Sequence, residues 1–71
     1  MEISESYFRN LNLNYGDLIY VQTETGEGFN GTYLGEYNGT TFSFSNFSNG
    51  QTESIILTKL QWLEKVKLSQ S

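Results

Sequence analysis

The fold is decided by residues 26–44, GEGFNGTYLGEYNGTTFSF, which combine five of the seven glycines of the chain with aromatic and β-prone residues. The Asn38-Gly39 pair within this stretch predicts a two-residue hairpin turn. Such a turn needs a positive φ at both central residues, and Asn and Gly tolerate that conformation best. We therefore expect two long strands joined at Asn38-Gly39.

The glycines that precede this turn predict a sharp bend in the first of the two strands. Glycine weakens the interior of a strand unless the strand must bend or another backbone must come close, as in a small barrel. Gly28, Gly31 and Gly35 recur at intervals that suit such bends. The stretch thus predicts a small, highly curved antiparallel sheet.

The length of 71 residues predicts a single domain with little interior. A chain this short buries only about 60% of the surface that its unfolded form exposes, so it is marginal without a disulfide, a metal or a partner chain. The sequence has no Cys and no His, which excludes disulfides and thiolate metal sites and implies no cofactor. Self-association is the remaining source of stability, and the eleven aromatic residues suit an interface.

We expect one domain over residues 1–71, with a helix over 4–10, a barrel over 17–66 and a polar tail over 67–71. Ser4 is a candidate helix N-cap, and Glu5 suits the positive end of the helix dipole. The expected strands cover Leu18–Thr23, Gly28–Tyr37, Thr40–Phe44 or beyond, Ile55–Leu57 as a buried strand, and Leu60–Val66. In the first strand, alternation places Ile19, Val21 and Thr23 on the inner face.

The segment 60–66 allows two interpretations. As a strand it has Leu60, Trp62 and Val66 on one side, whereas as a helix it aligns Leu60, Leu63 and Lys67. We favour the strand, because the preceding strands need a closing partner and a barrel removes free edges. Trp62 is then expected in the core or at an interface.

A short helix followed by five strands with a glycine-bent second strand is the layout of an all-β, SH3-like small barrel. The spacing of glycines and apolar residues further resembles the first Sm motif of the Sm/LSm/Hfq superfamily. The residues that carry this resemblance are Gly16, Ile19, Val21, Thr23, Gly26, Phe29, Gly31, Tyr33, Gly35, Phe42 and Phe44. The resemblance covers about 30 residues without a gap.

The resemblance implies a homo-oligomeric ring, from pentamer to heptamer, in which the fourth strand of one subunit pairs with the fifth strand of its neighbour. It also implies binding of single-stranded RNA, or RNA-chaperone activity, at positions that correspond to Tyr37, Thr40, Thr41 and Lys59. At these positions the Asp and the Asn of the family's motif are replaced by Tyr37 and Thr41. The second Sm motif corresponds at best to Leu57-Thr58-Lys59, which retains a positive charge without a guanidinium that stacks on bases. The alternative interpretation of Thr40, Thr41 and Lys59 is an ordinary hairpin loop and a solvated turn. For Tyr37 the alternative is an aromatic residue of the barrel or of an interface.

The composition narrows the function further. The net charge is −4, and residues 1–58 carry one base against seven acids, which argues against broad binding of nucleic acid. No His, no Cys and a single Asp leave little for acid–base or nucleophilic catalysis, so we expect no enzyme. We also expect no membrane span and a cytoplasmic location, and a sequence without Pro but rich in Asn and Ser suits an AT-rich genome such as that of a phage.

Two functions from different classes therefore remain. The first is an Sm-like ring that binds single-stranded RNA through the hairpin loop and Lys59. The second is a structural or protein-interaction barrel that keeps the ring and has lost RNA binding. The acidic charge and the missing Asp and Asn favour the second, and the gapless first motif favours the first.

Overall fold

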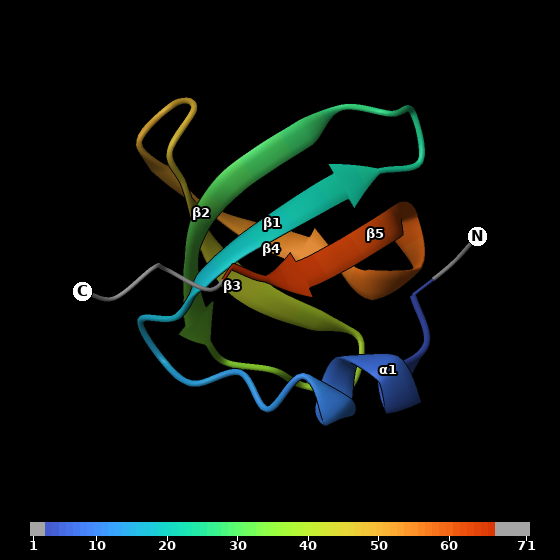
Figure 1. The fold of residues 1–71 in the computed structure, drawn as a ribbon. Coiled ribbons are helices and arrows are strands. Elements are labelled where there is room, and N and C mark those ends of the chain that lie inside the picture. The colour runs from blue at the N-terminus through green and yellow to red at the C-terminus, as the bar shows by residue number, and fades with distance from the viewer. Residues whose placement is uncertain (1–2, 67–71) are drawn as a thin grey trace.

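The computed structural model describes residues 3–66, and within them one helix precedes five strands (Figure 1). The elements are α1 (Glu5–Asn10), β1 (Leu18–Thr23), β2 (Gly28–Gly35), β3 (Thr41–Asn46), β4 (Gln51–Ile56), the 3₁₀ turn η1 (Leu57–Lys59) and β5 (Leu60–Lys65). This confirms the all-β class with a short N-terminal helix. The predicted polar tail, with Lys67, lies outside the described residues.

All five strands belong to one antiparallel sheet, in the order β4-β3-β2-β1-β5. Figure 1 shows β2 curving along its length, so that β3 and β4 lie behind β1 and β5. Strands β4 and β5 are the two ends of this order and are not hydrogen-bonded to each other within residues 3–66. The expectation that a barrel removes free edges is therefore wrong for the single chain, because β5 pairs only with β1.

The core lies inside the curl of the sheet and is completed by the helix. Ile19 and Val21 are fully buried, as predicted for the inner face of β1, whereas Thr23 at the end of the strand is only half-buried. From α1 and the residue before its N-cap, Phe8 and Ile3 reach the same core. As predicted, Ser4 caps this helix, since its hydroxyl accepts a hydrogen bond from the Tyr7 N–H at 3.0 Å.

Two glycines explain how β2 bends, as the sequence predicted. Gly31 is pressed against β3, where an added Cβ would overlap the Ser45 carbonyl oxygen and lie 2.5 Å from Cζ of Phe44. Gly35 has φ +83°, a left-handed conformation that favours glycine, and the β2–β3 register shifts between Tyr33 and Gly35. The sheet curls here because the side chains that would resist it are absent.

The predicted two-residue turn at Asn38-Gly39 is wrong. Strand β2 ends at Gly35 instead of Tyr37, and a loop of five residues, 36–40, leads to Thr41. Glu36 and Gly39 have positive φ values of 58° and 99°, whereas Asn38 does not. The left-handed residues Gly35 and Glu36 turn the chain out of the sheet before Asn38 is reached, so the turn starts earlier than its strongest sequence signal.

Strand β4 corrects the prediction of a buried strand at Ile55–Leu57. It covers Gln51–Ile56, lies at the edge of the sheet and has mostly exposed side chains. Only Leu57 of the predicted run is buried, and it belongs to η1. An apolar run at an edge strand has one side without a covering layer, which is why Ile56 remains exposed.

The segment 60–66 is a strand over Leu60–Lys65, as favoured, but its predicted faces are wrong. A register shift against β1 occurs between Gln22, opposite Trp62, and Thr23, opposite Leu60. The extra residue in β5 turns both Leu60 and Leu63 into the core and leaves Trp62 44% exposed. This bulge explains the helix-like spacing of the two leucines, and it places Trp62 outside the core.

No helix among residues 3–66 has the length and apolar character needed to cross a membrane.

Candidate functional site

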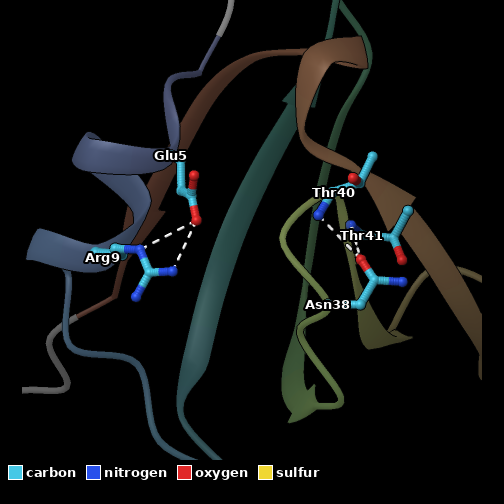
Figure 2. Close-up of polar contacts among 5 residues, drawn as sticks. All are labelled: Glu5, Arg9, Asn38, Thr40 and Thr41. Carbon is cyan, nitrogen blue, oxygen red and sulfur yellow. Dashed lines mark hydrogen bonds and ion pairs between the residues drawn. The ribbon is translucent and has the colours of Figure 1, made fainter.

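The loop 36–40 is shaped by the carboxamide of Asn38. Its Oδ1 accepts hydrogen bonds from the backbone N–H groups of Thr40 and Thr41, both at 2.9 Å, as Figure 2 shows. The Asn38 N–H donates to the Thr41 carbonyl at 3.1 Å. Asn38 therefore holds both candidate threonines in place through their backbones, and their hydroxyls make no hydrogen bond within residues 3–66.

Sequence reasoning assigned Asn38 to the turn and missed this role. The available signal was an Asn followed two and three residues later by threonines in a turn, because an Asn side chain often accepts hydrogen bonds from backbone N–H groups two or three residues ahead.

The loop 36–40 and the turn η1 are joined by a hydrogen bond, which places Thr40 and Thr41 beside the turn that contains Lys59. The Leu57 N–H donates to the Thr40 carbonyl at 3.0 Å, and Thr41 pairs with Ile56 in the β3–β4 ladder. Lys59 is the last residue of η1. Thr40 ends the loop 36–40, Thr41 begins β3 and Lys59 ends η1, and we call these three residues the loop-end site.

A shallow groove adjoins Lys59 between the end of β4 and the start of β5. Its volume is about 210 Å³, and it is lined by Thr23, Ser54, Ile55, Ile56, Lys59 and Leu60. The backbone of Lys59 is held by a hydrogen bond, because its carbonyl accepts the Glu24 N–H at 3.0 Å. The lining of the groove therefore includes an exposed lysine whose backbone is held in place.

Tyr37, the fourth predicted residue, is turned toward the helix instead of toward the loop-end site. Its ring packs against Phe8 with centroids 4.4 Å apart, and the guanidinium carbon of Arg9 lies 5.8 Å from its centroid. A ring with two such neighbours has little face left on which a base can stack. This agrees with the interpretation of Tyr37 as an aromatic of the barrel.

The hydroxyl of Tyr37 is buried and has no hydrogen-bond partner at suitable distance and angle within residues 3–66. Burial raises the pKa of Tyr37 above its usual range, and the neighbouring Glu5 carboxylate raises it further. Tyr37 is therefore neutral at physiological pH.

Lys59 differs from the other cations of the described chain. Arg9 forms an ion pair with Glu5 at 2.7 Å (Figure 2), and Lys65 forms one with Asp17 at 3.3 Å. The Glu5 carboxylate raises the pKa of Arg9, and Arg9 in turn lowers the pKa of Glu5. Among residues 3–66, Lys59 is the one cation without a carboxylate in ion-pair distance.

The groups of the loop-end site suit an anion or a polar edge. The site supplies two hydroxyls, each a donor and an acceptor, and one ammonium group with three donors. Within residues 3–66, His, Cys, Asp and Glu nowhere gather in a group that could hold a metal ion.

A scan against protein-family models and searches of curated proteins and of solved structures give no match to this chain.

Proposed function

We propose that this chain is a ring-forming, Sm-like binding module and that its loop-end site binds single-stranded RNA. The observation that carries the proposal is the hydrogen bond from the Leu57 N–H to the Thr40 carbonyl at 3.0 Å. It joins the loop after β2, which ends at Thr40 next to Thr41, to the turn η1 after β4, which contains Lys59. The resemblance of the β1–β3 sequence to the first Sm motif supports the same function.

Assembly is supported by the order of the strands. One sheet with two edge strands, β4 and β5, presents unpaired backbone groups on both sides of a very small domain. Head-to-tail pairing of β4 with β5 of the next copy satisfies both edges at once, and it closes a ring when the rotation between subunits divides a full turn. Burial between subunits adds the stability that 71 residues lack.

RNA binding follows from repetition of a weak site. One ammonium group and two hydroxyls contribute little alone, but a ring places one Lys59 per subunit around a common axis. The logarithm of the binding constant falls linearly as the logarithm of the salt concentration rises. For single strands the slope is about −0.7 for each phosphate that the protein neutralises. We expect salt-dependent binding with weak base preference, because the site has neither an amide that reads a base edge nor a free aromatic ring.

Fluorescence anisotropy with oligo-U, oligo-A and a mixed sequence, each at two salt concentrations, tests this function. Lys59→Gln should weaken binding and flatten the salt dependence. Lys65→Gln is the matched control, since it removes the same charge from the other end of β5, where Lys65 already pairs with Asp17. Thr41→Ala should weaken binding further when combined with the Lys59 variant. Equal losses for Lys59→Gln and Lys65→Gln would show that the loop-end site is not the contact.

A second candidate function is an adaptor that keeps the ring and binds protein. The packing of Tyr37 against Phe8 and the net charge of −4 favour it, because both weaken an RNA site. If no RNA binds at low salt while light scattering detects a ring, the adaptor replaces the RNA-binding function. A chain that remains monomeric at high concentration contradicts both.

A further inference from the structure

The two free edges of the sheet are unequal, and β4 is the open one. The Leu57 N–H bonds to the Thr40 carbonyl, so alternation along the antiparallel ladder turns the backbone groups of every second β4 residue away from β3. The residues whose N–H and C=O groups face the free edge are Thr52, Ser54 and Ile56. All three have exposed side chains, and none is charged. This strand contains neither Lys nor Pro, two residues that commonly protect edges, and its one charged residue, Glu53, lies opposite Phe44 and accepts hydrogen bonds from Asn46 and Asn49.

The same argument identifies the groups on the free edge of β5. The Val66 N–H donates to the Leu18 carbonyl at 2.9 Å, which makes this pair a hydrogen-bonded one. Hydrogen-bonded and non-hydrogen-bonded pairs alternate along β1 and β5. Leu63 and Val21, three pairs further on, therefore form a non-hydrogen-bonded pair. The carbonyl of Leu63 therefore points away from β1, toward the edge at which another strand has to pair.

That carbonyl is already occupied. The hydroxyl of Tyr7, on α1, donates to the Leu63 carbonyl at 2.7 Å, and the bond is partly buried. The Tyr7 ring packs against Trp62 with ring centroids 6.4 Å apart. The Trp62 indole N–H donates to the Glu64 carboxylate at 2.7 Å. Figure 1 shows α1 on the side of β5 away from β1, where this contact forms.

We propose that Tyr7 is a latch on the β5 edge, which opens when a second copy of this chain adds its β4 strand. The inference rests on the proposed self-assembly. A strand that pairs with β5 lies about 4.8 Å from it and brings its own N–H to the carbonyls of that edge. The Tyr7 side chain occupies this space beside Leu63. Assembly thus requires the Tyr7 hydroxyl to leave the Leu63 carbonyl. The aromatic ring of Tyr7 must also shift relative to Trp62.

The latch makes the β5 edge of the single chain hard to pair with another strand, whereas the β4 edge stays available for pairing. An edge that is covered by a side chain of its own chain resists pairing with unrelated strands. In a ring, the β4 edge of a second copy is held beside the β5 edge. The hydrogen bond lost between Tyr7 and Leu63 is then offset by several backbone hydrogen bonds between the two strands. The latch therefore selects against isolated or irregular contacts and favours the closed assembly.

The concentration at which the chain assembles tests the latch. Wild type, Tyr7→Phe and Tyr15→Phe are compared by light scattering and by sedimentation over a dilution series from about 1 mM downward. Tyr15→Phe is the matched control, because its ring is 79% exposed and its hydroxyl makes no hydrogen bond within residues 3–66. One neutral hydrogen bond corresponds to about fivefold in an equilibrium constant. We expect half-assembly of Tyr7→Phe at a concentration about fivefold lower than for wild type, with Tyr15→Phe unchanged.

A second measurement on the wild type keeps the test decisive if Tyr7→Phe does not fold. Nuclear magnetic resonance of the Leu63 carbonyl carbon and of the Tyr7 ring should show both signals shifting as the chain assembles. Unchanged signals in an assembled chain overturn the latch, as does a folded Tyr7→Phe that assembles no better than wild type, and both results leave the proposed ring standing. If wild type and Tyr7→Phe both stay monomeric throughout, the proposed assembly fails and the latch with it.

Discussion

Replacing Gly31 by Ala tests the reasoning about the bend of β2 most directly. The added methyl group would overlap the Ser45 carbonyl oxygen and lie 2.5 Å from Cζ and 2.6 Å from Cε1 of Phe44. Neither neighbour can move aside cheaply, because one is the backbone of a paired strand and the other is a fully buried ring. The substitution therefore forces β2 and β3 apart where Gly31 pairs with Asn46.

The expected cost follows from the behaviour of overpacked cores. One extra methylene group in a well-packed core destabilises by about 1–3 kcal/mol. The backbone contact puts Gly31→Ala in the upper part of that range, and the smaller freedom of an unfolded Ala chain offsets less than about 1 kcal/mol. For a domain of this size, a loss of about 2 kcal/mol lowers the unfolding temperature by about 8–16 °C.

Thermal unfolding followed by circular dichroism measures this change, and Gly28→Ala supplies the control. Gly28 lies on the same strand, and the atoms nearest to an added methyl group there belong to the ring end of the Tyr20 side chain, which can rotate away. We expect Gly28→Ala to unfold within a few degrees of wild type. Equal effects of the two substitutions, or a Gly31→Ala chain as stable as wild type, would refute the close-approach argument.

Three further predictions concern the helix N-cap, a buried hydroxyl and a carboxylate. Ser4→Ala should lower the free energy of unfolding by about 1 kcal/mol in urea titrations, because it removes the N-cap, whereas the exposed Ser6→Ala should not. Tyr37→Phe should leave the urea midpoint unchanged or raise it, since it removes a buried hydroxyl without a partner; a clear loss would contradict this. The N–H of Asn14 lowers the pKa of Asp17, so its stabilisation is present at neutral pH and lost as the pH falls through that lowered pKa. Wild type and Asp17→Asn should therefore differ in stability at pH 7 and converge in acid.

Local patterns in the sequence were sufficient for much of the fold. The alternation of Ile19 and Val21 determined the inner face of β1, and Ser4 with Glu5 determined the start of α1. These features depend on neighbours within a few residues, so the sequence contains all the information they need. The glycines of β2 likewise indicated a bend, although not which of them would be pressed against β3.

The errors occurred where one part of the sheet acts on another. The turn at Asn38 begins at Gly35, because the β2–β3 register had already shifted before the Asn-Gly pair. The faces of β5 were assigned wrongly because the bulge opposite Gln22 and Thr23 is defined by pairing with β1. A single strand cannot reveal a bulge, since a bulge is a mismatch between two strands.

The candidate site divides in the same way. Thr40, Thr41 and Lys59 were proposed from the resemblance to the Sm motifs, and the structure adds that Thr40 is hydrogen-bonded to η1, the turn that contains Lys59. The packing of Tyr37 on Phe8 and the bond from Tyr7 to Leu63 were not predictable, because each joins residues from elements far apart in the chain.

The sequence by itself thus determined a small, bent, all-β domain with a capped helix, because periodicity, turn residues and caps are local properties. The tertiary structure decided which edge is open, which is covered, and which rings are already packed. These depend on the alternation of hydrogen bonds across paired strands and on contacts between α1 and the sheet, which exist only after the chain has folded.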